Sequence, residues 1–91
     1  MPFTHYIVFG DTKTQMTQEE AKKAWAEYGR ALKKHNMKMT GPFGPFGVSE
    51  GIAFILEGSY ADFEKYIGSD AFQKCPIMNT RTISLWKVPW A

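Results

Sequence analysis

The chain has 91 residues, and its mass of 10.4 kDa leaves room for one domain with one hydrophobic core, covering residues 1–91. Its 44% hydrophobic and 15% aromatic content excludes a disordered chain. Its net charge of +2 is too small to indicate a nucleic-acid surface. We therefore expect a globular domain with no nucleic-acid partner.

The sequence shows no sign of a membrane or secretory segment. No apolar run approaches the roughly 18 residues that a membrane span needs. The first residues also lack a basic start followed by a long apolar stretch, so we expect no secretory signal. The single cysteine, Cys75, excludes an internal disulfide framework and fits a reducing compartment. We expect a cytoplasmic protein in which Cys75 is a packed, small hydrophobic residue.

The first predicted element is a strand over residues 3–9. It is rich in β-branched and aromatic residues and stops at Gly10 and Asp11. Alternate residues of a strand face opposite ways. Here both faces are apolar, with Phe3, His5, Ile7 and Phe9 on one and Tyr6 and Val8 on the other. Because one layer of helices covers only one face, something else should cover the second.

A helix is predicted from about Gln18 to His35. Thr17 and Glu20 have the spacing of a capping box at its start. Asn36, which tolerates a left-handed conformation, ends it. One helical face carries the residues that should pack against a sheet: Ala21, Ala24, Trp25, Tyr28, Leu32 and His35. The opposite face is charged and is interpreted as solvated.

Two strands with different properties follow. The triplet Gly-Pro-Phe occurs twice within residues 41–47, and proline donates no backbone hydrogen bond. Residues 38–43 are therefore predicted to form a short or bulged edge strand that passes into a loop at the rim or at a dimer contact. Residues 51–57 (GIAFILE) are almost all apolar, which is typical of a central strand buried on both faces.

The second half of the chain contains a weaker helix and a last strand. Ser59 caps the helix, Ser69 caps a further short turn, and Pro76 stops it. Residues 81–88 alternate as a strand does, with Ile83 and Leu85 on one face. The order is β-α-β-β-α-β. It predicts an α+β, ferredoxin-like fold with a four-stranded antiparallel sheet and two helices on one face.

Residues 51–78 also carry a resemblance to a known family. An apolar strand ends in Glu57, a helix follows, then a step of a small residue, Asp70 and an aromatic residue, and Pro76 before the last strand. In this the chain resembles dimeric α/β-barrel proteins, among them the antibiotic-biosynthesis-monooxygenase-like, YciI-like and muconolactone-isomerase-like proteins. The resemblance implies a homodimer whose two sheets meet face to face and close into a barrel. It also implies a cleft between sheet and helices that binds small aromatic or polyketide-like molecules, haem or lactones.

His5 is the candidate catalytic residue. It lies on the first strand among apolar neighbours, where a histidine serves as a general base or orients a polar substrate group. The alternative is a neutral histidine that makes one or two structural hydrogen bonds. The YciI-like branch uses a His–Asp pair. The nearest equivalent here, His5 with Asp11, is separated by about 20 Å along an extended strand.

The aromatic residues suggest a ligand pocket. The candidate substrate-binding residues are Tyr6, Trp25, Tyr28, Phe43, Phe72, Ser84 and Trp86. Core packing is the alternative for each of them. We expect no metal, because two histidines 30 residues apart do not make a metal-ligand spacing. No cofactor is expected either, and the Asn, Trp and His set of the haem-degrading branch has no counterpart here.

Three hypotheses for function result. The first is a homodimeric barrel that binds a small aromatic or apolar molecule. If it is an enzyme, we expect cofactor-independent, monooxygenase-like or isomerase-like chemistry with His5 as base. The second is a non-catalytic ligand-sensing or protein-interaction module, and the third is haem binding through one axial histidine. Trp90, near the chain end, is predicted to dock against the fold or the partner subunit.

Overall fold

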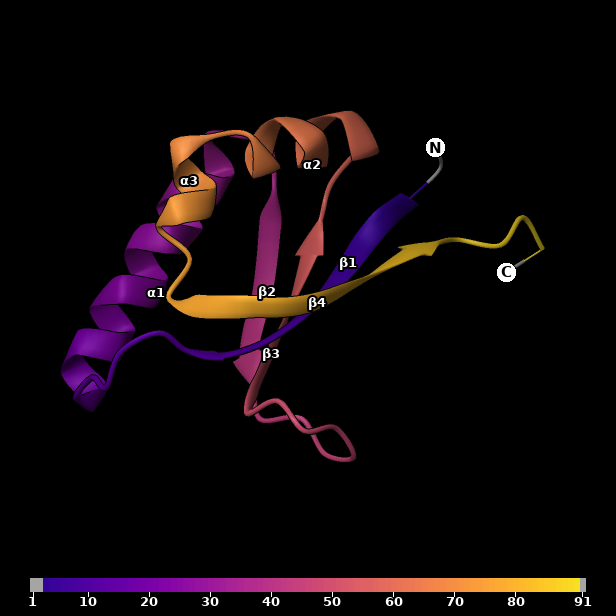
Figure 1. Cartoon of the computed structure of the whole chain (residues 1–91). Helices are drawn as coiled ribbons and strands as arrows, with labels where there is room; N and C mark the ends of the chain where they lie inside the picture. The colour runs from indigo at the N-terminus through magenta and orange to yellow at the C-terminus, as the bar shows by residue number, and fades with distance from the viewer. Residues whose placement is uncertain (1–2, 91) are drawn as a thin grey trace.

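The computed structural model describes the chain from residue 3 to residue 90, and at residues 79 and 80 it describes the backbone. It is an α+β fold with an antiparallel sheet and helices (Figure 1). The elements in chain order are β1 (Phe3–Thr12), α1 (Gln18–Lys33), β2 (Lys38–Phe43), β3 (Ile52–Glu57), α2 (Tyr60–Ile67), α3 (Asp70–Gln73) and β4 (Ile77–Trp86). The short α3 begins after Ser69, so two helices rather than one separate β3 from β4. This arrangement is compatible with a ferredoxin-like fold. The prediction that the Ser69 side chain caps this turn is wrong, because its hydroxyl donates to the Tyr66 carbonyl at 2.7 Å.

The four strands form one sheet in the order β2-β3-β1-β4, and every neighbouring pair is antiparallel. The prediction of a four-stranded antiparallel sheet is thus confirmed. β2 lies at an edge, and its pairing with β3 shifts register between Thr40 and Phe43. This confirms the bulged edge strand that the prolines predicted.

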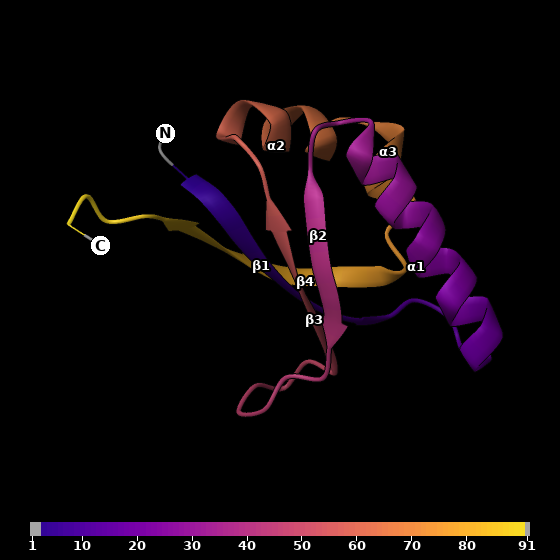
Figure 2. The same cartoon turned by 180° about the vertical axis from the view of Figure 1, so that it is seen from behind.

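The helices pack on one face of the sheet. Figures 1 and 2 show α1, α2 and α3 gathered on one side, while the β2–β3 loop and the C-terminal segment extend away from them. On the helical side, Tyr6 and Val8 of β1 and Leu56 of β3 are buried against Leu32 of α1 and Tyr66 of α2. The hydrophobic core therefore lies between the helices and this face.

The start of α1 follows the predicted capping box. The Thr17 hydroxyl accepts the Glu20 backbone N–H at 3.1 Å, and the Glu20 carboxylate accepts the Thr17 N–H at 2.9 Å. The hydrogen bond that the Glu20 carboxylate accepts from the Thr17 backbone is the main cause that lowers the pKa of Glu20, and the Thr17 side chain lowers it further. The helix ends at Lys33, two residues before the predicted end. Asn36 has the expected left-handed conformation, with φ of 58°.

β1 and β4 differ in extent from the prediction. β1 continues past Gly10 to Thr12, because β4 starts at Ile77 rather than at residue 81 and pairs with it along that stretch. The register shifts between Phe9 and Gly10. A Cβ atom on Gly10 would collide with the carbonyl oxygen of Met78. The glycine that seemed to end the strand is therefore needed where β1 and β4 approach most closely.

Two segments carry exposed aromatic rings beyond the packed layers. Phe46 on the β2–β3 loop is fully exposed, and Trp90 after β4 is 84% exposed. The prediction that Trp90 docks against its own fold is therefore wrong, and docking on a partner stays a prediction. Among the described residues, no helix is both long enough and apolar enough to span a membrane.

Candidate functional site

The face of the sheet opposite the helices is apolar at its centre. The register places Ile55 of β3, Ile7 of β1 and Ile83 of β4 side by side across the sheet. Leu85 lies two residues further along β4 on the same face. Ile83 and Leu85 are each 41% exposed, and Ile7 and Ile55 are half-buried. We call this surface the open face, because no helix of the described chain covers it (Figure 2).

One end of the open face carries His5. Its Nε2 atom lies 3.6 Å from Oε2 of Glu57, the residue directly opposite on β3. Its Nδ1 atom lies 2.8 Å from the Thr4 hydroxyl. Asp11, the nearest sequence equivalent of a His–Asp partner, accepts a hydrogen bond from the Gly51 N–H at 2.9 Å. A carboxylate therefore does accompany His5, and it comes from the neighbouring strand.

The other end of the open face holds a second ion pair. Arg81 of β4 donates from Nε to Oε2 of Glu50 at 2.7 Å, and the Glu50 side chain is buried. The Arg81 guanidinium also lies 4.4 Å from the centre of the Phe9 ring. These contacts attach the β2–β3 loop to β4 and cover Phe9. We therefore interpret Arg81 as a structural residue.

A small cavity lies on the helical side of the sheet, beside Trp25. Its volume is about 260 Å³. It is lined by Thr12, Gln15, Met16, Ala21, Trp25, Ile52, Pro76 and Ile77. These residues come from the β1–α1 loop, the first turns of α1, and the adjoining ends of β3 and β4. Most of the wall is apolar, and Thr12 and Gln15 supply polar side chains.

The predicted aromatic residues divide between core and surface. Tyr6 and Tyr28 have no exposed surface, and Phe72 packs edge-on against Tyr66 with 5.7 Å between ring centres. Trp25 packs edge-on against Phe54 at 5.4 Å and, of the predicted set, it alone lines the cavity. Core packing, the alternative to ligand binding, thus accounts for Tyr6, Tyr28 and Phe72.

The other three predicted binding residues lie on strands. Ser84 is half-buried and pairs with Tyr6, so it shares the helical side. Phe43 and Trp86 are about half exposed at the ends of β2 and β4. These residues do not converge with Trp25 on one pocket in the described chain.

Tyr28 and Tyr66 form a hydroxyl-to-hydroxyl hydrogen bond in the core, next to Cys75. Burial raises the pKa of both tyrosines and of the Cys75 thiol. A thiol with a raised pKa is a poor nucleophile. The prediction that Cys75 is a packed, small hydrophobic residue is confirmed.

His5 and Trp25 lie on opposite sides of the sheet. Trp25 contacts Phe54, whose neighbour Ile55 faces the other way, together with Ile7 and His5. The predicted catalytic residue and the predicted ligand wall therefore belong to two separate places. The described residues contain no group of three His, Cys, Asp or Glu side chains that could hold a metal ion.

No family model matches the chain, and no curated protein matches it. The relationship to dimeric α/β-barrel proteins therefore rests on the sequence features described above and stays a prediction.

Proposed function

We propose that this chain is a ferredoxin-like protein that pairs through its open face into a homodimeric α/β barrel and binds a small apolar or aromatic molecule in the cytoplasm. The observation that carries the proposal is the apolar centre of the open face. Burying this row of isoleucines stabilises the dimer by about 25 cal/mol for each Å² of apolar surface removed from water. A second copy of the same face supplies that cover.

The exposed area supports the same conclusion. The chain exposes 6201 Å², whereas a monomer of this mass typically exposes about 5,400 Å². The excess of about 800 Å² equals what one partner contributes to a standard protein interface. Part of it lies on the β2–β3 loop and the C-terminal segment, where Phe46 and Trp90 are exposed.

The charges on the open face do not oppose pairing. His5 lies beside Glu57 and Arg81 is bound to Glu50 within one chain. The register also places Lys38 of β2 directly opposite Glu57. Each of these charged side chains therefore has a neighbour of opposite charge, and a second sheet laid on this face avoids the several kcal/mol that an isolated buried charge would cost.

Ile83 and Ile67 have nearly equal exposed fractions, 41% and 40%, and allow a matched test of the dimer. Ile83→Lys places a charge at the centre of the open face, and Ile67→Lys places one on α2, away from it. We expect Ile83→Lys to raise the dimer dissociation constant at least about a hundredfold, because a buried unpaired charge costs roughly 3–5 kcal/mol. Sedimentation equilibrium measures this. An equal effect of Ile67→Lys, or none of Ile83→Lys, contradicts pairing through this face.

For the ligand, we propose the cavity beside Trp25. Small-molecule sites are concave and mostly apolar, with a few polar groups that orient the ligand. The cavity has this composition, with Trp25 as an aromatic wall and Thr12 and Gln15 as polar groups. Its volume of about 260 Å³ suits a molecule of one or two fused rings.

Indole is a suitable probe of the cavity. We expect saturable shifts of the Trp25 indole N–H resonance in NMR titrations with indole. Ala21→Leu fills the cavity and should abolish these shifts, whereas Ala61→Leu on the exposed side of α2 should leave them unchanged. Shifts that persist in Ala21→Leu would place the bound indole elsewhere.

The His5–Glu57 pair supports a proton-transfer role if the protein is an enzyme. When His5 accepts a proton, the adjacent carboxylate stabilises the resulting imidazolium. In the proposed dimer this chemistry lies between the two sheets. His5→Gln should therefore leave indole binding beside Trp25 unchanged, and a loss of indole binding would contradict the separation of the two sites.

A further inference from the structure

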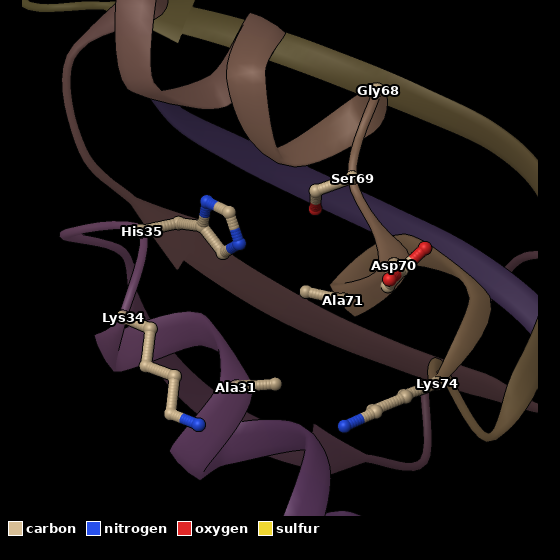
Figure 3. Close-up of a pocket in the computed structure, with 8 residues that line it drawn as sticks. All are labelled: Ala31, Lys34, His35, Gly68, Ser69, Asp70, Ala71 and Lys74. Carbon is tan, nitrogen blue, oxygen red and sulfur yellow. The ribbon is translucent and has the colours of Figure 1, made fainter.

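A second hollow lies between the C-terminal end of α1 and the turn that joins α2 to α3. Its volume is about 470 Å³. It is lined by Ala31, Lys34, His35, Gly68, Ser69, Asp70, Ala71 and Lys74 (Figure 3). This hollow is remote from the open face and contains none of the residues that line the cavity beside Trp25.

Among the titratable side chains around this hollow, three are basic and one is acidic. Figure 3 shows the His35 ring pointing toward Ser69 and the Lys74 side chain reaching toward α1, which carries Lys34 at its end. Within the described part of the chain, no carboxylate lies within ion-pair distance of Lys34 or Lys74. Asp70 lines the same hollow and is its one acidic side chain. The hollow thus has an excess of unneutralised positive charge.

The position of basic residues at the C-terminal end of α1 explains only part of this positive charge. Basic side chains at a helix C-terminus interact favourably with the helix dipole, which accounts for Lys34 and His35. Lys74 does not belong to α1. It follows α3 and reaches the hollow from the opposite wall. Two small residues, Ala31 and Ala71, lie between the basic groups and leave room for a ligand.

We propose that this hollow binds the phosphate group of a small molecule, held by Lys34, His35 and Lys74. A phosphate carries up to two negative charges and several acceptor oxygens, so it suits two ammonium groups and an imidazole that donate from two walls. The proposal does not depend on the dimer or on the cavity beside Trp25. Asp70 repels the phosphate charge. Removing the Asp70 charge should therefore strengthen phosphate binding, whereas removing a lysine charge should weaken it.

Inorganic phosphate is the first probe. We expect saturable shifts of the His35 ring resonances and of the Ala31 and Ala71 methyl resonances in NMR titrations of the full chain at constant ionic strength. Lys34→Gln and Lys74→Gln should each weaken phosphate binding about twofold to fivefold, as the loss of one exposed charge pair predicts. Asp70→Asn should tighten it about threefold by removing a like charge. All three positions are exposed, so these variants should fold.

Lys22→Gln is the matched control, because Lys22 is an exposed lysine of α1 that does not line the hollow. Shifts that grow linearly without saturation, or that sodium chloride reproduces, overturn the proposal. An equal loss of phosphate affinity in Lys22→Gln also overturns the proposal, because phosphate binding would then depend only on the net charge of the protein. Titration with glycerol phosphate distinguishes the source of the phosphate: tighter binding than inorganic phosphate supports an ester ligand, and equal binding supports the free anion.

Discussion

At the scale of single residues, the core is built around polar aromatic side chains. The Tyr28 and Tyr66 hydroxyls bond to each other beside Cys75, and the Tyr6 hydroxyl donates to the Phe3 carbonyl at 3.1 Å. Core and ligand pocket use the same residue types. The sequence could therefore place Tyr6 and Tyr28 on inward-facing positions without showing whether those positions line a cavity or a packed interior.

The tyrosine pair yields a stability prediction. Tyr28→Phe leaves the Tyr66 hydroxyl buried without its partner, which should reduce the free energy of unfolding by about 1–3 kcal/mol. Removing both hydroxyls, in Tyr28→Phe with Tyr66→Phe, should cost less than the sum of the two single variants. Urea denaturation of the four proteins measures this. Additive losses would show that the two hydroxyls do not depend on each other.

His5 is predicted to contribute little to stability. Its contacts to Thr4 and Glu57 lie on a half-exposed surface, where such pairs are worth about 0–1 kcal/mol. His5→Ala should therefore lower the free energy of unfolding by no more than about 1 kcal/mol, measured in the Ile83→Lys background, which we expect to be monomeric. A much larger loss would favour a structural histidine over a functional one.

Cys75 should be unreactive in the folded protein. Its thiol is buried, and burial raises its pKa, so little thiolate forms at pH 8. We expect a thiol reagent such as dithionitrobenzoate to react with Cys75 only after denaturation in urea. Rapid reaction of the native protein would contradict a packed thiol.

At the scale of elements, local sequence signals were sufficient to predict the ends of α1. Features that depend on the pairing of strands far apart in the sequence could not be predicted. The capping box at Thr17 and the left-handed Asn36 depend on adjacent residues, and both were predictable. The extension of β1 past Gly10 depends on where β4 begins, some 70 residues later, and was not predictable. The His5–Glu57 pair required the register of β1 against β3. The Glu that ends the apolar strand was the available signal.

The α1 cap can be tested directly. Thr17→Ala removes the hydroxyl that accepts the Glu20 N–H and should destabilise the protein by about 1 kcal/mol. Thr14→Ala, in the exposed β1–α1 loop, serves as the control and should change stability by less than about 0.5 kcal/mol. Equal effects of the two variants in urea denaturation would contradict a specific cap.

At the scale of the whole molecule, the buried tyrosines predict how stability depends on pH. Burial raises the pKa of Tyr6, Tyr28 and Tyr66. A raised pKa favours the neutral form in the folded state. The resulting stability is complete below about pH 10, where unfolded tyrosines ionise, and is lost as the pH rises further. We expect alkaline unfolding above pH 10, with tyrosinate absorbance and circular dichroism changing together. Ionisation of these tyrosines without unfolding would contradict their burial.

In the proposed homodimer, a second copy of this chain covers the open face of the sheet. Sedimentation equilibrium of the unmodified protein, over loading concentrations from about 1 to 100 µM, measures whether this dimer forms. We expect a mass of twice 10.4 kDa at the upper end of this range. A mass of 10.4 kDa at every concentration would contradict it, because the isoleucine row would then remain exposed to water.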